Sequence, residues 1–396
     1  MIDFVNIELK QHVGVTAKPI VAEGDYVQKG QLIAVCEGLG ANIHASVYGV
    51  VAETGQDAVK IKMDAHQPDE FVKILGWGLA PAQSHLDMVK QAGIVGAGGA
   101  GFPAHIKFAA DLAGGTFILN GAECEPILGH NIQVLAEQAD LIVRGMKYTM
   151  EMVNANMGYI AIKPKHIREL TQLVKICKDE PHIEIKFLPD IYPVGDERVI
   201  VREILGITLQ PGQLPLEVGA VVSNVETIKR VTEAIELGKP VITKDFTVAG
   251  RVNSSGSIYL DEPIGMPVKK YIDDCGGYLQ PHGEILLGGP FTGKSGDEQS
   301  TITKTLGGIF VAMPFPNHAH KFGILACECG GDEQRLREIA NGMGGEIVAA
   351  EMCKRMVEVN GRYRCDQPGN CPGQSEKILK LKSAGADAVL VGSCED

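Results

Sequence analysis

The segment Gly96–Pro103 has the composition of a loop that binds phosphate. It reads GAGGAGFP, and Lys107 follows it. Glycines let the backbone approach a phosphate closely, and a helix that begins after the loop offers free N–H donors. Gly96, Gly98 and Gly101 match G-x-G-x-x-G, which alone is a weak signal. A dinucleotide fingerprint also needs a strand just before the loop, whereas residues 86–96 have the pattern of a helix. A glycine-rich turn without a ligand remains the alternative.

Three other segments place polar side chains directly after an apolar strand pattern. Residues 120–126 read NGAECEP, and two carboxylates beside an asparagine can bind the hydroxyls of a ribose or ribityl chain. The alternative is a solvated acidic loop. Residues 192–198, YPVGDER, combine an aromatic residue, a glycine and two acids. Residues 221–228, VVSNVETI, form a strand-to-helix junction, where a polar side chain commonly serves only as a helix cap. Ligands gather at such strand ends in open α/β sheets.

Cysteines form a second concentration of reactive groups. The chain has 10 cysteines, and those after residue 320 fall in a short stretch with several at the ends of predicted strands. In a reducing compartment such residues are thiols, metal ligands or redox groups rather than structural disulfides. Buried inert thiols are the alternative, although the density argues against it. The members of this group are Cys327, Cys329, Cys353, Cys365, Cys371 and Cys394.

The elements that must position these residues indicate an α/β protein of several domains. Residues 1–70 alternate apolar and polar positions between glycine turns, which is typical of β-hairpins. Residues 84–235 alternate strands with amphipathic helices, which predicts a largely parallel sheet covered by helices. Residues 244–293 return to short strands around one brief helix, and residues 321–396 again read as strand, helix and strand.

Composition excludes several classes of function. The net charge is −12 and aromatic residues make up 5% of the chain, so a nucleic-acid or anionic-membrane partner is not expected. No apolar run reaches the ~18 residues that a membrane helix needs, and no secretory signal opens the chain. We therefore expect a soluble, cytoplasmic protein without an integral membrane segment.

The four motifs occur in an order that resembles the flavin-binding domain shared by the C subunit of Rnf-type electron-transport complexes and the 51 kDa NADH-oxidising subunit of respiratory complex I. The resemblance covers roughly residues 1–315. The first 70 residues are similar to a lipoyl-type barrel-sandwich domain, although no lysine between Lys29 and Lys60 could carry a swinging cofactor. Residues 244–293 are similar to the β-grasp-like SLBB module of the same family.

The resemblance implies FMN and NADH as cofactors and assigns roles to individual residues. The glycine loop and Lys107 would hold the flavin phosphate, and Phe102 would stack on the nicotinamide nucleotide. Glu125 and Glu197 would lie near its ribose as the catalytic pair. Ala122 and Ala97 stand where relatives carry aspartate and often arginine. The flavin-binding set that the resemblance implies is Gly96, Gly98, Gly99, Lys107, Asn120, Glu123, Tyr192, Gly195, Asp196, Asn224 and Thr227.

The C-terminal segment departs from the Rnf pattern, because it lacks the two ferredoxin-type cysteine runs of those subunits. It resembles the small [2Fe–2S] delta subunit of methyl-viologen-reducing hydrogenases, which implies that the six cysteines include cluster ligands. A dithiol or selenothiol relay is the alternative. An Rnf-like chain with such an end also resembles the electron-transfer protein associated with D-proline reductase in clostridia, which carries a selenocysteine near this end. The final VLVGSCED is what a reading frame cut at a UGA codon would leave.

These observations predict an electron-transfer protein. NADH would reduce bound FMN, and electrons would pass through the cysteine centre to a partner reductase, with proline reductase suspected. The alternative is a non-catalytic Rnf-like scaffold or assembly subunit with a vestigial flavin site. An oligomer is compatible with the sequence, which does not fix the number of subunits.

Overall fold

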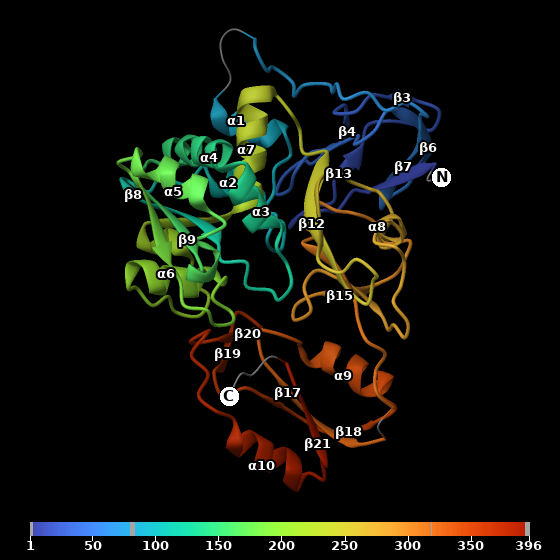
Figure 1. The fold of residues 1–396 in the computed structure, drawn as a ribbon, viewed down its shortest axis with the longest axis vertical. Helices are drawn as coiled ribbons and strands as arrows, with labels where there is room; N and C mark the ends of the chain where they lie inside the picture. Colours follow the sequence, from blue (N-terminus) through green and yellow to red (C-terminus); the bar gives the residue numbers. More distant parts are fainter. Residues whose placement is uncertain (1–2, 80–83, 318, 393–396) are drawn as a thin grey trace.

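The computed structural model describes residues 3–79, 84–317 and 319–392. In sequence order they form a small β unit, a central α/β unit, a second β unit and a C-terminal α/β unit, as the sequence predicts. Figure 1 shows the first three units lying together, while the C-terminal unit, in orange and red, stands apart below them. None of the helices in these ranges is both long and apolar enough to cross a membrane.

The N-terminal unit consists of two small antiparallel sheets with strand orders β1-β7-β6-β3 and β2-β4-β5. Successive side chains of a strand point to opposite faces of the sheet, and the residues on the inner face form the core of this unit. Val5 and Ile7 of one strand and Val59 and Ile61 of its neighbour are fully buried. The hairpins predicted for residues 1–70 are therefore confirmed. The strands are β1 (Phe4–Glu8), β2 (Lys18–Pro19), β3 (Tyr26–Val27), β4 (Leu32–Val35), β5 (Ile43–His44), β6 (Gly49–Thr54) and β7 (Ala58–Met63).

The central unit has a four-stranded parallel sheet in the order β10-β9-β8-β11, with helices on its faces. Because both faces are covered, β8 in the middle of the sheet has a continuous buried apolar run at residues 117–119, whereas β10 at the sheet edge alternates apolar and charged residues. The helices are α1 (His85–Gln91), α2 (Ala104–Lys107), α3 (His130–Glu137), α4 (Ala139–Met152), α5 (Thr171–Lys178), α6 (Glu197–Leu205) and α7 (Val225–Leu237), with 3₁₀ turns at Pro164–His166 and Pro215–Val218. The strands are β8 (Gly115–Gly121), β9 (Ala155–Ile162), β10 (Ile183–Phe187) and β11 (Ala220–Asn224).

Two of these helices begin within predicted motifs. Asp196 caps α6 by accepting a hydrogen bond from Arg198 N, and Asn224 caps α7 by accepting one from Glu226 N at 2.8 Å. Satisfying an otherwise free N–H in this way fixes where a helix starts. The capping role considered for the polar residues of 221–228 is thus the one that Asn224 has.

The second β unit extends further than the sequence predicts. Its five-stranded sheet has the order β13-β12-β16-β14-β15 and runs to Val311, whereas the predicted boundary is residue 293. The four-residue β16 was missed because its parallel partner is β12, far earlier in the chain, which only the fold reveals. The elements are β12 (Thr243–Gly250), β13 (Ser257–Pro263), α8 (Val268–Asp274), β14 (Ile285–Leu287), β15 (Lys294–Gly296) and β16 (Gly308–Val311).

The C-terminal unit contains a three-stranded parallel sheet in the order β18-β17-β21 and a separate hairpin, β19-β20. This agrees with the strand, helix and strand pattern predicted for residues 321–396. Its own core is small and centres on Ile324, Ala326 and Leu336. The elements are β17 (Lys321–Ala326), α9 (Glu333–Gly342), β18 (Glu346–Met352), β19 (Met356–Val359), β20 (Arg362–Cys365), α10 (Ser375–Ser383) and β21 (Ala388–Val391).

The first three units share one hydrophobic core. A single cluster of buried side chains includes Val5 from the first unit, Phe117 from the second, and Phe246 and Val311 from the third. Burial of this kind is the main favourable term in folding, so these units hold one another in place. The loops that carry the predicted motifs are therefore positioned by all three units.

Candidate functional site

The predicted glycine loop closes on itself between α1 and α2. Val95 and Pro103 form an isolated antiparallel bridge, and Gly96 N donates to Phe102 O at 2.9 Å. Gly98 passes so close to Asn224 that an added Cβ would lie 2.7 Å from its side-chain nitrogen. At Gly99, by contrast, an added Cβ would meet nothing within 4 Å. The loop is thus packed on one side and open on the other.

The open side of the loop faces a pocket of about 150 Å³. It brings together most of the predicted flavin-binding set and adds Ser223, which the sequence analysis placed in a motif without giving it a role. Phe102, at the pocket's edge, is 40% exposed. The predicted residues that line the pocket are Gly96, Gly98, Gly99, Phe102, Lys107, Asn120, Gly195, Glu197, Asn224 and Thr227.

Polar side chains hold the walls of this pocket in position. Asn120 donates from Nδ2 to Gly195 O at 3.0 Å and accepts from Ala122 N at 3.1 Å. Thr227, which is buried, accepts from Ala97 N at 3.0 Å through its hydroxyl. The Asn120–Gly195 bond joins the end of β8 to the loop after β10, and the Thr227–Ala97 bond joins the first turn of α7 to the glycine loop. The strand ends that the sequence analysis expected to converge do so.

Lys107 supplies the positive charge of the pocket. Its Nζ lies 2.6 Å from Oε1 of Glu197, and the two side chains are 29% and 43% exposed. Partial exposure leaves the ammonium able to exchange this partner for a phosphate. The one-turn helix α2 on which Lys107 lies begins after Pro103, which has no N–H of its own to donate.

A larger cleft of about 810 Å³ adjoins the pocket and shares Gly98, Gly99, Asn120, Gly195 and Asn224 with it. All three N-terminal units line this cleft. Sequence reasoning missed the contributions of the two β units, because no motif marks them and only the fold brings them near the glycine loop. These missed residues include Lys10, Gln11 and His12 from the first unit and Lys294, Thr303 and Thr305 from the third.

Glu123 and Glu125 line the larger cleft, where both carboxylates already have partners. Glu123 accepts from the backbone N and the side chain of Asn131 at 2.9 and 3.3 Å. Glu125 accepts from Phe291 N at 3.1 Å, from Thr292 N at 2.9 Å and from the Thr292 hydroxyl. An added Cβ at Gly289 would clash with this carboxylate. Glu125 therefore fastens the β14–β15 loop to the central unit.

Tyr192 and Asp196, two members of the predicted flavin-binding set, are not brought to the pocket. The Tyr192 hydroxyl donates to the carbonyl of Cys329, and its ring lies edge-on to Phe291 with centroids 4.7 Å apart. Burial raises the pKa of this phenol. Asp196 caps α6 and pairs with Arg198 at 2.9 Å. Tyr192 thus turns toward the C-terminal unit, which supplies a partner that the motif spacing does not indicate, whereas Asp196 is held by Arg198 of its own motif.

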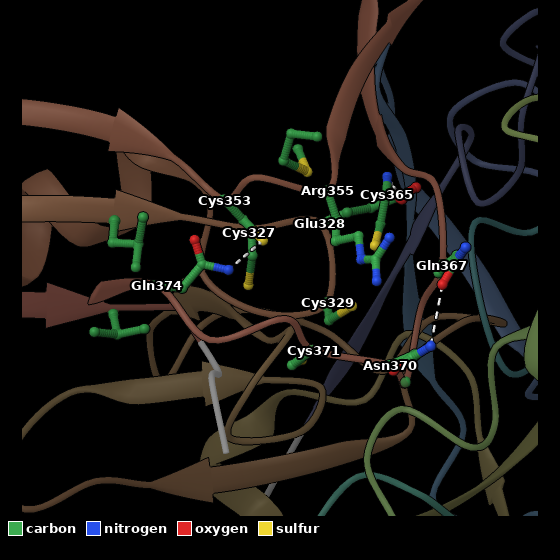
Figure 2. A pocket seen from close by; sticks show the side chains of 14 residues that line it. Cys327, Glu328, Cys329, Cys353, Arg355, Cys365, Gln367, Asn370, Cys371 and Gln374 are labelled. Carbon is green, nitrogen blue, oxygen red and sulfur yellow. Dashed lines mark hydrogen bonds between the residues drawn. The ribbon is translucent and has the colours of Figure 1, made fainter. Parts of the chain in front are cut away.

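Five of the six C-terminal cysteines surround one cavity of about 30 Å³, shown in Figure 2. Cys329 and Cys365 lie close enough for each to shift the pKa of the other, and Gln374 donates from Nε2 to Cys353 Sγ at 3.0 Å. Cys394 lies outside the described residues. In the part of the chain that the structure describes, no three His, Cys, Asp or Glu side chains are grouped closely enough to hold a metal ion. The expected cluster ligands are thus near one another but are not arranged as a ligand shell.

The glycine-loop pocket does fit an FMN. Backbone N–H groups of a loop whose glycines leave open space, together with one ammonium, suit a phosphate. The side chains of Asn120, Ser223 and Asn224 offer the amide and hydroxyl groups that suit a ribityl chain. The adjoining cleft offers room for a second, larger ligand beside it.

Comparison with known proteins agrees with this geometry. A model of the Nuo51 FMN-binding domain matches residues 89–233, and a model of the RnfC barrel sandwich hybrid domain matches residues 2–67. In NAD⁺-reducing [NiFe]-hydrogenase, a chain with a TM-score of 0.51 and 22% identity covers 59% of this chain and 47% of its own length, which shows a shared fold.

Three curated relatives define the extent of the similarity. The C subunit of the proton-translocating ferredoxin:NAD(+) oxidoreductase complex of Clostridium ljungdahlii is 35% identical over 310 residues, 74% of this chain and 66% of that protein. The cobalamin reductase PduS of Citrobacter freundii is 39% identical over 59% of this chain and 51% of its own length. The C subunit of the Na(+)-translocating ferredoxin:NAD(+) oxidoreductase complex of Acetobacterium woodii is 32% identical over 74% of this chain and 69% of that protein.

The chain spans between half and about two thirds of the length of these relatives. The matched segments carry the barrel-sandwich unit, the glycine loop and the pocket described above. The chain belongs to the RnfC family, whose central unit is a Nuo51-type FMN-binding domain.

Proposed function

We propose that the protein is an FMN-dependent oxidoreductase that takes electrons from NADH and passes them to an acceptor protein. The observation that carries this proposal is the pair of adjoining cavities that share the glycine loop, one lined by groups that suit FMN and one open beside it. FMN, when bound, accepts a hydride from a nicotinamide and can release electrons to other acceptors. The remaining chemistry belongs to the side chains of this chain.

The glycine-loop N–H groups and Lys107 bind the phosphate, and Asn120, Ser223 and Asn224 orient the ribityl chain. Phe102, partly exposed at the pocket's edge, stacks on the nicotinamide nucleotide. Glu197, across the pocket, and Glu125, in the adjoining cleft, lie where they can accept hydrogen bonds from its ribose hydroxyls. Binding ribose at Glu125 would require it to share its bonds with the β14–β15 loop.

The nucleotide specificity follows from these carboxylates. A carboxylate accepts bonds from the 2′-hydroxyl of NADH and repels the 2′-phosphate of NADPH. Arg198, the nearest arginine in the motifs, is occupied by Asp196 and Glu328 on the side facing the C-terminal unit. Lys10 and Lys294 also line the cleft. Their positive charges would attract the 2′-phosphate of NADPH and so oppose this preference. We expect NADH to be favoured by at least about 100-fold in kcat/KM, or ~3 kcal/mol.

The C-terminal cysteines form the exit for electrons. Two residues that line their cavity, Cys329 and Cys365, accept hydrogen bonds from Tyr192 and Arg198, which flank Gly195 and Glu197 in one loop of the central unit. A thiol centre, a selenothiol centre and a [2Fe–2S] cluster are the three chemistries that the sequence leaves open. Proline reductase is the acceptor that the sequence resemblance suggests.

Absorbance of the anaerobically purified protein tests this proposal. We expect flavin bands near ~370 and ~450 nm and bleaching of the second band by NADH, but not by equal NADPH, on the time scale of mixing. Protein that binds no FMN when the flavin is added in excess would instead support a non-catalytic scaffold. Comparable bleaching by both nucleotides would show that these acids do not line the ribose site.

A further inference from the structure

Two of the cavity cysteines are placed as a pair. Cys329 follows β17, and Cys365 ends β20, yet both line the same cavity of about 30 Å³, and Glu328, the neighbour of Cys329, accepts a hydrogen bond from Cys365 N. Cys365 is buried and Cys329 is half-buried. Two thiols on one cavity of this size need little further movement to form a disulfide. Cys353, on the same cavity, has a partner of another kind, because its sulfur accepts a hydrogen bond from the Gln374 amide.

One loop of the central unit holds the backbone of both cysteines. At one end of the loop, the Tyr192 hydroxyl donates to Cys329 O. At the other end, Arg198 Nη1 donates to Cys365 O at 2.8 Å. Glu328 adds two further hydrogen bonds to this arrangement, since its carboxylate accepts one from Arg198 at 3.0 Å and one from Cys365 N at 2.5 Å. The relative position of the two thiols is therefore fixed from the FMN-binding domain.

The same loop lines the flavin pocket. Gly195 and Glu197, which lie between Tyr192 and Arg198 in sequence, face that pocket. A single short segment, residues 192–198, thus contacts both sites, so the thiol pair is fastened directly to a wall of the pocket. A chance meeting of two structural cysteines would not need such a connection.

We propose that Cys329 and Cys365 form a redox-active pair that cycles between disulfide and dithiol and receives the electrons taken from NADH. The proposal rests on the function proposed above. Reduction is a two-electron, two-proton step: NADH gives up a hydride and becomes NAD⁺, solvent gives one proton, the S–S bond breaks and two S–H bonds form. Tyr192 and Arg198 act as positioning residues, because they bind carbonyls and not the sulfurs.

The environment distinguishes the two thiols. The hydrogen bond from Cys329 lowers the pKa of Cys365, and the same bond, together with burial, raises the pKa of Cys329. Cys365 is therefore the more acidic thiol of the pair. The thiolate is the nucleophile in thiol–disulfide exchange.

Peptide mapping of the full-length, FMN-loaded protein tests the pairing. The protein is oxidised with oxidised glutathione, freed of reagent, alkylated under denaturing conditions and digested with trypsin. We expect peptide Phe322–Arg335 to be linked to peptide Cys365–Lys377. Each peptide holds a second cysteine, so matched variants assign the bond. The link should vanish in Cys329→Ser and Cys365→Ser and persist in Cys327→Ser, Cys371→Ser and the distant Cys177→Ser.

Anaerobic addition of NADH tests the direction of electron flow. In the oxidised wild type, we expect NADH to convert the link into two additional alkylated thiols per chain. If NADH bleaches the flavin but leaves the link intact, the inference fails and the proposed function stands. If NADH does not bleach the flavin at all, the proposed function fails while the mapping with glutathione still decides the pairing.

Two results would overturn the pair. One is a link that persists in Cys365→Ser or is lost in Cys371→Ser to the same extent as in Cys329→Ser. The other is stoichiometric iron and acid-labile sulfide in anaerobically purified wild type, lost in variants of several of the five cysteines, because the sulfurs would then ligate a cluster.

Discussion

Two arginines, each surrounded by carboxylates, mark two different kinds of contact between domains. Arg230 lies on α7 between the central and second β units and is 4% exposed. Arg198 lies between the central and C-terminal units, and its side chain is 13% exposed. The first belongs to a closed network, whereas the second sits at the border of a separate unit. The network around Arg230 comprises Glu226, Lys229, Glu233, Lys239, Lys244, Asp245 and Asp261.

The contrast shows how the molecule is assembled. The closed network includes side chains of α7, whose apolar residues belong to the core that the first three units share, so separating these units would break buried ion pairs and expose apolar surface. The C-terminal unit has its own small core and reaches the rest of the molecule largely through polar contacts, such as Arg198 to Glu328 and Arg335 to Glu284. The first three units thus form one flavin-binding body with a shared core. The C-terminal unit, which carries the cysteines, is attached to this body through contacts between charged side chains.

The largest effect is expected from breaking the closed network. Burial opposes ionisation of Asp245, but Arg230 and Lys229 outweigh it and lower its pKa. Asp245→Ala would leave these cations short of a buried partner, at a cost of about 3–5 kcal/mol in unfolding free energy. Thermal or denaturant unfolding of the full chain measures it. Glu37→Ala, which breaks an exposed pair with Lys18, is the control and should change stability by less than about 1 kcal/mol. Equal losses of unfolding free energy in the two variants would contradict the view that the closed network holds the units together.

Lys304 is a second buried basic residue, and it lies where the three N-terminal units meet. Lys304 Nζ donates to Asn42 O and to Gly93 O, both at 2.7 Å, and so joins all three N-terminal units. Burial lowers its pKa to about 7. Burial, and to a lesser extent Lys304 itself, also lower the pKa of His12 and of His44, the latter to about 3, so both rings stay neutral above pH 7.

The pH dependence of stability follows from this lowered pKa. Between about pH 7 and the ordinary lysine value of 10.5, the unfolded chain holds a proton at Lys304 that the folded chain does not. Stability relative to Lys304→Met should therefore rise with pH in this window, by up to ~1.4 kcal/mol per unit. Denaturant unfolding of both proteins at pH 7, 8 and 9 measures the difference. A difference that does not change with pH would show that Lys304 keeps its charge when buried.

Much of the fold could be predicted from the sequence because its signals are local. The apolar stretches of β8, β9 and β11, the alternating segment of β10 and the amphipathic helices between them identify the parallel sheet. The network around Arg230 could not be predicted in this way. Glu226 and Arg230 have the i, i+4 spacing of an exposed helix face, and only the approach of β12 encloses them.

Some residues of the candidate site could likewise be predicted from local sequence signals, and others could not. Asn120 ends β8 at the edge of the parallel sheet where ligands gather, and the glycine loop and Lys107, on the α1–α2 segment before β8, line the same pocket. Tyr192 and Asp196 belong to the same motif as Gly195 and Glu197 but lie on the other side of that loop. The partner of Tyr192, the Cys329 carbonyl, lies in the C-terminal unit, which spacing within a motif cannot reveal, whereas Asp196 pairs with Arg198 of its own motif.

A smaller effect is expected in the flavin pocket itself. Lys107→Ala would remove a charge-assisted bond to the flavin phosphate worth roughly 1.5–3 kcal/mol, or about 10- to 100-fold in FMN affinity. Quenching of flavin fluorescence on titration measures the affinity. Lys90→Ala, an exposed change on the neighbouring helix α1, is the control. Unchanged FMN affinity in Lys107→Ala would remove the lysine from the phosphate site while leaving the body intact.

The smallest effect tests the docking of the C-terminal unit. Arg198→Met would remove the bonds to Glu328 and to Cys365 O, while the shared core of the body stays unchanged. For partly exposed charges we expect a loss of roughly 1–2 kcal/mol, which raises the undocked fraction by about 5- to 30-fold. Proteolysis within residues 312–320, which connect the units, should quicken by that factor, because cleavage follows the open population when opening is fast. Lys165→Met breaks an exposed pair with Asp190 on the same domain and should leave the rate unchanged. If both variants are cut as slowly as the wild type, the C-terminal unit is held by more than charge, and the contrast between the two arginines does not hold.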